Sequence, residues 1–256
     1  MKTDDLESRM RRLEWFHSLR ALPDAWPIIR VDGRSFSRLT AASFEKPFDQ
    51  RFHAIMTSTA AALLEALQGV YCYTESDEIS ILLPSKSDLF DRELEKLVSV
   101  SAGIASATFT HQLGNPAHFD SRLCLAASVG LVVDYFRWRQ ADAARCALNG
   151  WCYWTLRKER QSAAQATRAM KGKSVTDKTE LLLEHGINFD ELPSWQRRGT
   201  GIYWKQFEKQ GVNLKTGETV TAARRRVYVD EHIPSGRDYD GFIQGFVAVQ
   251  DPLATG

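Results

Sequence analysis

The chain has 256 residues, of which 43% are hydrophobic and 25% charged, and its formal net charge is +1 at pH 7. This composition is typical of an ordinary soluble globular protein with ample material for a core. The small net charge excludes a global attraction to nucleic acid, so any such binding must come from a local basic surface.

The sequence indicates a reduced, cytoplasmic protein without a membrane partner. No apolar run approaches the roughly 20 residues that cross a bilayer, and the charged amino terminus lacks the apolar core of a secretory signal. The cysteines form no CxxC pair and lie in apolar or helical surroundings, which is typical of reduced core residues. They are Cys72, Cys124, Cys146 and Cys152.

The first part of the chain predicts alternating helices and strands. Residues 1–20 have the pattern of an amphipathic helix, and residues 26–31 have that of a buried strand. Residues 50–67 carry a clear apolar stripe at helical spacing. Two runs rich in β-forming residues, 70–74 and 79–83, are joined by an acidic stretch and predict a hairpin.

A further helix is predicted at residues 89–110. After the break at Gly114-Asn115-Pro116, residues 122–127 predict a fourth strand. The resulting order β-α-β-β-α-β is the signature of a ferredoxin-like unit, so we expect an α+β fold.

Helices dominate the expected structure of the second half. A long helix at residues 132–158 is expected to be interrupted at Gly150, and residues 161–185 predict one or two polar helices. From Pro193 onward the chain has turns and short aromatic runs, for which we expect short strands.

Two acidic clusters follow strand-like runs, and their spacing allows them to meet on one sheet. Asp32 ends the first predicted strand, while Asp77 and Glu78 stand in the turn of the predicted hairpin. Carboxylates that converge in this way repel one another unless a cation lies between them. Such an oxygen-ligated site is typical of Mg²⁺ and phosphate chemistry. Gly33 lets a backbone carbonyl or a phosphate approach without a Cβ in the way.

The alternative is ordinary turn chemistry, in which Asp32 caps a turn and the other two acids decorate a hairpin tip. The presence of both clusters on adjacent predicted strands favours the metal site. Neighbouring residues on a regular strand face opposite ways, and a turn breaks that parity. The sequence therefore leaves open whether Asp77 or Glu78 is the better ligand.

Cationic side chains accompany the acidic clusters and suit the binding of a triphosphate. Arg30, Arg34 and Lys46 lie near the first cluster in the sequence, and Arg92 and Lys96 lie four apart on one helical face. The alternative for the latter two is a solvated face on which they pair with neighbouring glutamates.

A basic stretch follows the long predicted helix. Residues 157–178 contain seven cations and two acids, and further cations follow at Arg197-Arg198 and at 224–226. Clusters of this kind gain affinity for polyanions by releasing counterions. The stretch is either an RNA-binding surface or an ordinary solvated face.

Several motifs, considered together, resemble the tRNA-histidine guanylyltransferase superfamily over about residues 22–200. The resemblance implies a polymerase-like palm in residues 1–130, with a helical and basic RNA-binding extension packed on it in residues 131–256. The motifs are RVDGRSF (30–36), FEKPFD (44–49), TESDEIS (74–80), FDSR (119–122), FRWRQAD (136–142), DKTELL (177–182) and GINFDELP…RRGT (186–200).

The resemblance also implies a role for individual residues. Asp32, the Gly33 carbonyl and Asp77 would hold two Mg²⁺ ions, and Glu78 would support this catalytic site. Nucleotide and triphosphate binding is implied for one set of residues, and RNA binding for another. The first set is Arg30, Arg34, Lys46, Ser76, Arg92 and Lys96, and the second is Arg139, Lys171, Lys173, Lys178, Arg197 and Arg198.

The implied activity is nucleotide addition in the 3′-to-5′ direction onto the 5′ end of tRNA. ATP would first adenylylate the 5′ end, and an incoming nucleoside triphosphate, GTP among them, would then be transferred at the two Mg²⁺ ions. The implied partners are tRNA and nucleoside triphosphates, and the implied assembly is a homotetramer built as a dimer of dimers.

Two stretches depart from the family pattern. Eukaryotic guanylyltransferases carry a His-Ile-Asn-Asn-Leu-Tyr-Asn block where this chain has residues 144–150, and Phe48 replaces the Asn of the family's Lys-Pro-Asn-Asp. The replaced block is associated with recognising histidine tRNA, and the chain is more similar to the bacterial and archaeal guanylyltransferase-like proteins. We therefore expect template-dependent repair of 5′-truncated tRNA, with guanosine addition at position −1 of histidine tRNA as the alternative.

Two alternatives belong to other classes of protein. A nucleotidyl cyclase shares a similar palm with paired acids, but the motifs of the 5′-RNA-end family and the basic stretch argue against it. A non-catalytic RNA-binding protein on a relic palm is the other, and the retention of Asp32, Asp77 and Glu78 argues against that one.

Overall fold

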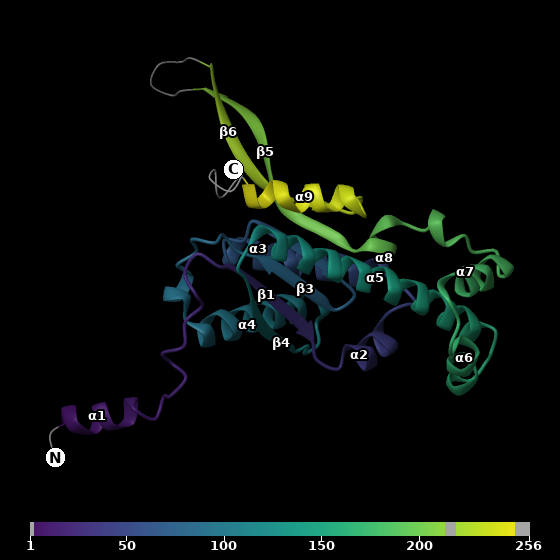
Figure 1. The fold of residues 1–256 in the computed structure, drawn as a ribbon, viewed down its shortest axis with the longest axis horizontal. Coiled ribbons are helices and arrows are strands. Elements are labelled where there is room, and N and C mark those ends of the chain that lie inside the picture. The colour runs from purple at the N-terminus through teal and green to yellow at the C-terminus, as the bar shows by residue number, and fades with distance from the viewer. Residues whose placement is uncertain (1–2, 213–218, 249–256) are drawn as a thin grey trace.

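The computed structural model describes residues 3–212 and 219–248. Its strands form one six-stranded antiparallel sheet in the order β4-β1-β3-β2-β5-β6 (Figure 1). The strands are β1 (Trp26–Gly33), β2 (Tyr71–Glu75), β3 (Glu78–Leu82), β4 (Phe119–Ala126), β5 (Thr200–Val212) and β6 (Thr219–Asp230).

Helices cover both faces of this sheet (Figure 1). The α-helices are α1 (Thr3–Arg11), α2 (Phe36–Ser43), α3 (Gln50–Ala66), α4 (Leu94–Leu113), α5 (Val129–Lys158), α6 (Ala163–Met170), α7 (Val175–Glu184), α8 (Ser194–Arg198) and α9 (Arg237–Ala248). Two short 3₁₀ helices are η1 (Leu89–Arg92) and η2 (Phe189–Glu191). Among the described helices, none is long and apolar enough to cross a membrane.

The predicted ferredoxin-like unit is confirmed. Its strands take the order β4-β1-β3-β2, and α3 and α4 are the two crossover helices. Local signals set the helix ends, because the Asp49 side chain accepts hydrogen bonds from the first turn of α3, and α4 stops at Gly114 with φ 77°.

The core has one layer on each face of the sheet. On the α3 and α4 face, Val31 and Ile79 pack with apolar residues of both helices. On the opposite face, Ile28 and Tyr71 pack against α5 and α9. Burial on both faces explains why the central strands read as nearly continuous apolar runs.

Three predicted helices differ from those in the structure. The amino-terminal helix ends at Arg11, well before residue 20. The helix expected at 89–110 is split into η1 and α4, because residues 90–92 take positive φ angles. The long helix passes through Gly150 without a break. A helical glycine costs only about 1 kcal/mol, and the buried residues on both sides, such as Leu148 and Cys152, offset it.

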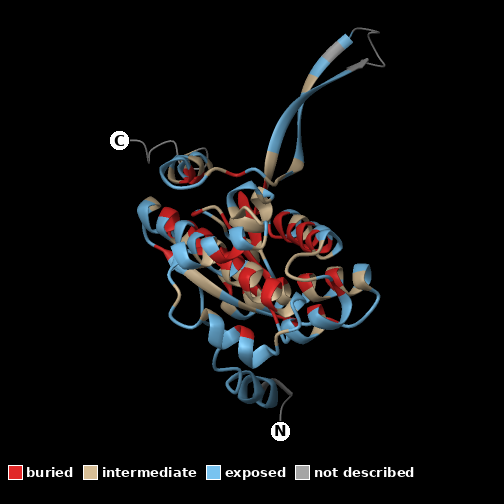
Figure 2. Cartoon of the chain, turned by 90° about the vertical axis from the view of Figure 1, so that its right-hand side faces the viewer, coloured by how far each residue is buried: buried red, intermediate tan, exposed pale blue. Residues whose placement is uncertain are grey.

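The carboxyl-terminal strands are long, and the expectation of short ones is wrong. β5 has 13 residues and β6 has 12, and they form a hairpin that extends beyond the sheet with mostly exposed side chains (Figures 1 and 2). Cations pack on its aromatic rings, for example Arg225 on Trp204 at 4.4 Å, so apolar and charged residues are mixed along both strands. Residues 249–256 of the predicted extension lie outside the described residues.

Candidate active site

The structure brings the two acidic clusters together, as predicted. In the register of β1 with β3, Asp32 lies opposite Glu78. The Gly33 N–H donates a hydrogen bond to the Asp77 carbonyl oxygen at 3.0 Å, which fixes the β2–β3 turn beside the end of β1. Three acids from two segments 45 residues apart in the sequence therefore meet at one end of the sheet.

Asp77 has the environment of a metal ligand. Burial raises the pKa of its carboxyl group, and the charge of Asp32 raises it further. Ser76, which adopts φ 49° at the turn, donates a hydrogen bond from Oγ to Asp77 Oδ1 at 3.1 Å. A divalent cation between the two carboxylates would offset both the burial of the Asp77 charge and its repulsion by Asp32. Carboxylate oxygens are the ligands that Mg²⁺ prefers.

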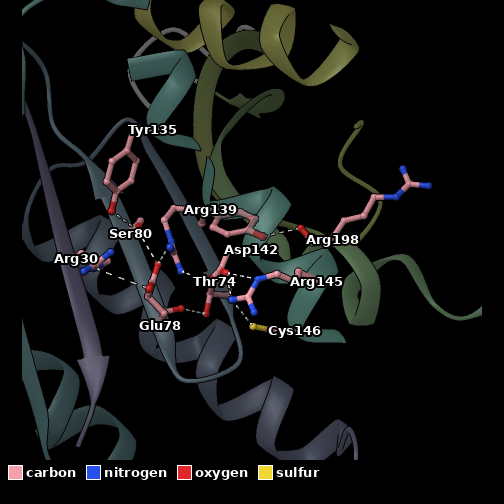
Figure 3. A network of polar contacts seen from close by, with 11 residues as sticks. Arg30, Thr74, Glu78, Ser80, Tyr135, Arg139, Asp142, Arg145, Cys146 and Arg198 are labelled. Atoms are coloured by element: carbon pink, nitrogen blue, oxygen red, sulfur yellow. Dashed lines mark hydrogen bonds and ion pairs between the residues drawn. The ribbon is translucent and has the colours of Figure 1, made fainter. Parts of the chain in front are cut away.

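Glu78 is held in a different way. Its Oε1 accepts a hydrogen bond from Arg139 Nε at 2.6 Å, and its Oε2 lies 3.9 Å from Arg30 Nε (Figure 3). Burial raises the pKa of Glu78, while the charge of Arg139 opposes that shift. This geometry favours Asp77 as the metal ligand and makes Glu78 the attachment point for α5.

Gly33 is required for packing. A Cβ on this residue would lie 2.5 Å from ring atoms of Phe36, which is buried beneath the turn into α2. The structure thus supplies a reason for glycine that the sequence did not indicate. Coordination of a metal by the Gly33 carbonyl stays a prediction.

A cavity of about 280 Å³ opens beside Asp77, between α2, α3, α5 and α8. Lys46 lines it and donates a hydrogen bond from Nζ to Thr40 Oγ1 at 2.6 Å. Burial lowers the pKa of Lys46, although the charge of Asp77 opposes the shift. A partly desolvated ammonium group facing a cavity suits an anionic group such as a phosphate.

The far wall of this cavity is aromatic. The His53 ring stacks on Trp195 with ring centroids 4.1 Å apart, and Phe48 meets Trp195 edge to face at 5.7 Å. His53 Nε2 also lies 2.9 Å from a carboxylate oxygen of Glu231, which follows β6. A flat aromatic wall opposite a cation is the pairing of surfaces that a nucleoside phosphate needs.

The predicted nucleotide-binding cations divide into two groups. Arg30 lies beside the carboxylates, and its buried Nε has no hydrogen-bond partner within the described part of the chain. Arg34 is exposed directly after Gly33. Arg92 and Lys96 lie elsewhere, near the start of α4.

The distance between these groups follows from the length of α4. The carboxyl end of α4 approaches the carboxylates through Phe119, the partner of Gly33. A 20-residue helix is about 30 Å long, so its amino end lies at the opposite edge of the fold. There Lys96 Nζ pairs with Glu93 at 3.1 Å, as in the solvated-face alternative.

The predicted RNA-binding residues also divide. Arg139 is 5% exposed and held by Glu78, so its expected place on an RNA-binding surface is wrong. Arg197 donates from Nε to the Leu192 carbonyl at 2.9 Å, and Arg198 Nη1 lies 3.5 Å from the Ile233 carbonyl. Arg197 thus holds a neighbouring segment of the chain, and Arg198 lies against the loop after β6.

The remaining lysines are more accessible. Lys171 and Lys178 line an open groove between α5, α6 and α7 together with Arg168. Lys173 is half-buried in the α6–α7 turn, close to this groove.

The sequence reasoning missed several residues around the site. Arg122 on β4 lies opposite Arg30. Its hydrogen bond to Asp120 raises the pKa of Arg122, and the charges of Asp32 and Glu78 raise that pKa further. Arg122 begins the strand predicted at residues 122–127, which was a usable signal for this placement. The contact between His53 and Trp195 had none, because 142 residues separate them.

Paired carboxylates at the ends of adjacent strands in a ferredoxin-like sheet, beside a cation-lined cavity, define a palm of the kind that transfers nucleotides. Comparison with known proteins agrees. Residues 7–127 match the family model described as tRNAHis guanylyltransferase, and residues 130–233 match the model of the Thg1 C-terminal domain.

Similar proteins come from eukaryotes and bacteria. The probable tRNA(His) guanylyltransferase of Mus musculus is 33% identical over 227 residues, covering 81% of this chain and 76% of that protein. The tRNA(His) guanylyltransferase 2 of Arabidopsis thaliana is 33% identical over 214 residues, 78% of this chain but only 39% of that longer protein. A bacterial tRNA(His) guanylyltransferase (Thg1)-like protein, solved in complex with GTP, superposes with a TM-score of 0.75 at 27% identity, covering 95% of this chain and 99% of that one.

The chain therefore belongs to the tRNAHis guanylyltransferase family, which is a family of nucleotidyltransferases.

Proposed function

We propose that this protein adds nucleotides in the 3′-to-5′ direction to the 5′ end of tRNA, using the opposing strand as template, and so repairs truncated 5′ ends. The observation that carries the proposal is the meeting of Asp32 and Asp77 beside a cavity that presents Lys46. Membership of the guanylyltransferase family supports the reaction class.

The donor set fits Mg²⁺, because it consists of carboxylate oxygens and the Asp77 pKa is raised by burial and by the charge of Asp32. Asp32, Asp77 and the Gly33 carbonyl would hold the ions. When bound, two such ions would lower the pKa of an attacking hydroxyl group and neutralise charge that develops on phosphate oxygens.

The reaction has two balanced steps. A phosphate oxygen at the RNA 5′ end attacks the α-phosphorus of ATP, forming a 5′-5′ pyrophosphate linkage and releasing pyrophosphate. The 3′-hydroxyl oxygen of the incoming nucleotide then attacks the RNA 5′-phosphorus, losing its proton and displacing AMP. Each step forms one P–O bond and breaks another.

The side chains of the site position these reactants. Lys46 neutralises the phosphates of a nucleotide in the cavity, where its low-dielectric surroundings strengthen the attraction. Arg30 offers donors beside Glu78, and Arg34 is exposed directly after Gly33. Glu78, anchored by Arg139, keeps the end of β3 in register with Asp32.

The preference for repair over guanosine addition to histidine tRNA rests on residues 144–150. These residues lie on α5, and Arg145 and Cys146 are exposed there in place of the block associated with histidine tRNA. The similar bacterial Thg1-like protein was solved in complex with GTP, which supports a nucleoside triphosphate as substrate in either case. The names of the eukaryotic relatives, which are tRNA(His) guanylyltransferases, favour guanosine addition at position −1, which is the second candidate.

We further propose, by resemblance to the family, that the protein is a cytoplasmic homotetramer. Light scattering coupled to gel filtration tests the assembly: four times the 29.0 kDa chain mass is expected, and a monomer would contradict it.

The function is tested with a 5′-monophosphorylated tRNA that lacks its first nucleotide, incubated with ATP, Mg²⁺ and each nucleoside triphosphate in turn. Addition of the pairing nucleotide alone is expected, and Asp77→Ala is expected to abolish it. Guanosine added only to full-length histidine tRNA would overturn repair in favour of the second candidate. Cyclic nucleotide formed without RNA would indicate a cyclase, and binding without product would indicate a non-catalytic protein.

A further inference from the structure

Trp138 is an exposed aromatic residue next to the catalytic carboxylates. It lies on α5, and 53% of its surface is exposed. Its ring is nevertheless fixed, because the Arg139 guanidinium lies 4.4 Å and that of Arg30 5.6 Å from the ring centroid. Tyr135 meets it edge to face at 5.8 Å. The indole is therefore held in place before any ligand arrives.

The ring is tied to the site through the two arginines. Both of them contact the Glu78 carboxylate, which lies opposite Asp32 in the β1–β3 pair (Figure 3). Trp138 thus lies on the α5 face of the sheet, one side chain away from Glu78. It lines neither the cavity beside Asp77 nor the groove at α6 and α7.

The charges around the ring suit a nucleic-acid strand. Arg30 has a buried Nε without a hydrogen-bond partner among the described residues, and Arg122 lies opposite Arg30 on β4. An exposed, pre-ordered aromatic ring flanked by cations binds a nucleobase by stacking and its phosphate by charge.

We propose that Trp138 is the platform on which the terminal base of the RNA 5′ end stacks, so that its 5′-phosphate is presented to Asp32 and Asp77. This inference rests on the proposed function, and it makes Trp138 a substrate-positioning residue. The reaction joins two substrates at the carboxylates. The cavity with Lys46 pairs a cation with an aromatic wall, as a mononucleotide needs, whereas a base-paired RNA end needs an open platform such as Trp138 provides.

The test is a binding measurement that needs no turnover. A short RNA hairpin carries 2-aminopurine as its 5′-terminal, base-paired nucleotide, and its fluorescence is followed as protein is added. The wild type, Trp138→Ala, Trp138→Phe and Leu131→Ala are compared. Leu131 is the matched control because it is 52% exposed on the same helix, two turns earlier. Binding of ATP by calorimetry is measured for each protein.

We expect the wild type, Trp138→Phe and Leu131→Ala to quench the fluorescence and to bind the RNA within about threefold of one another. Trp138→Ala is expected to lose the quenching and to bind RNA roughly 5- to 150-fold more weakly, the range for loss of one base–aromatic stack. Its ATP affinity is expected to be unchanged.

Three results would overturn the proposal. Trp138→Ala that quenches like the wild type would show that the base stacks elsewhere. An equal loss of RNA and ATP binding would mean a purely structural role. If Trp138→Ala changes the molecular mass of the assembly but not the quenching, Trp138 makes a contact between copies of the chain. Failure of the proposed function is a separate outcome, since a wild type that quenches but never extends RNA would contradict the function and leave the platform in place.

Discussion

Arg139 Nε and Glu78 Oε1 lie 2.6 Å apart in a buried ion pair that joins α5 to β3 directly behind the catalytic carboxylates. Arg139 Nη2 also donates to Asp142 on its own helix at 3.0 Å. The pair therefore connects the helix that carries Trp138 to the strand that carries the site.

Breaking this pair from one side should destabilise the protein strongly. Arg139→Met leaves the buried Glu78 with only Arg30, whose Nε lies 3.9 Å away, and Glu78→Met leaves the buried guanidinium with Asp142 as its remaining anion. Each change is expected to cost about 3–5 kcal/mol of unfolding free energy. The double variant should be more stable than either single variant, because neither member of the buried pair is left behind without the other. Urea denaturation of all four proteins measures the coupling, and additive losses would contradict a direct interaction.

Replacing Asp77 with asparagine should separate stability from activity. Desolvation and the charge of Asp32 raise the Asp77 pKa, so the neutral Asp77→Asn is expected to melt at the same temperature as the wild type or higher when Mg²⁺ is absent. Adding Mg²⁺ should stabilise the wild type and leave the variant unchanged, and RNA extension should fall by at least about 10²-fold. Asp134→Asn, at an exposed position on α5, is the control. An equal Mg²⁺-induced shift in Asp77→Asn would refute the metal assignment.

Lys46→Met should weaken nucleotide binding without weakening the fold. The ammonium group is partly desolvated, and burial lowers its pKa, so an apolar chain of similar length is tolerated in its place. Loss of one charge-assisted phosphate contact is expected to weaken ATP binding by roughly tenfold or more. Titration calorimetry and thermal melting give the two quantities. Unchanged ATP affinity would mean that the triphosphate does not enter this cavity.

Two glycines with the same φ angle should differ in their tolerance of alanine. Gly199 and Gly172 both have φ 76°, but a Cβ at Gly199 would lie 2.5 Å from Tyr73 Oη, whereas a Cβ at Gly172 meets open space. Tyr73 cannot retreat, because its hydroxyl donates to the Arg198 carbonyl at 2.8 Å and its ring is buried. Gly172→Ala should cost only the backbone strain, about 1 kcal/mol. Gly199→Ala should cost about 3 kcal/mol or more, measured by urea denaturation; equal losses would contradict the packing described here.

The ion pair at the end of α7 should make stability depend on pH. His185 Nδ1–H donates a hydrogen bond to the Leu181 carbonyl oxygen at 2.7 Å, and its Nε2 lies 2.8 Å from Glu159 on the loop after α5. The Leu181 carbonyl and then the charge of Glu159 raise the His185 pKa, so the folded state binds the proton more tightly than the unfolded state. This stabilisation is complete below pH 6.5 and is lost as the pH rises through the raised pKa.

The variant His185→Gln should therefore be less stable than the wild type at pH 5.5, and this stability deficit should be smaller at pH 8.5. The difference should stay within about 1 kcal/mol because the pair is partly exposed. Thermal melts of both proteins at the two pH values measure it. A larger deficit at pH 8.5 would contradict the assigned direction of the pKa shift.

The sequence predicts the palm because its helices and strands bury apolar side chains and so leave recognisable apolar patterns in the sequence. The apolar stripe of α3 and the β-rich runs of β2 and β3 are local signals, and the acids at the end of β1 and in the β2–β3 turn stand at positions where topology alone brings them together. The long β5–β6 hairpin escapes prediction because most of it packs on no helix, and its aromatic rings are covered by its own arginines.

The positions of the cations follow less directly from the sequence than the positions of the acids. Arg92 and Lys96 are separated from the site by the length of α4, which no local pattern records. Arg139 reads as a surface cation within a polar segment, yet the packing of α5 on the sheet buries it against Glu78. A long flexible side chain can lie at the surface or in a buried ion pair, and tertiary contacts decide which of the two it does.

The most direct test of templated 3′-to-5′ addition is to change the base that opposes the missing nucleotide. Two tRNAs lacking their first nucleotide would be prepared, identical except that the opposing base is C in one and A in the other. The expected result is addition of G to the first and of U to the second, with both products lost in Asp32→Ala. Addition of G to both would contradict templating and identify the protein as a dedicated guanylyltransferase.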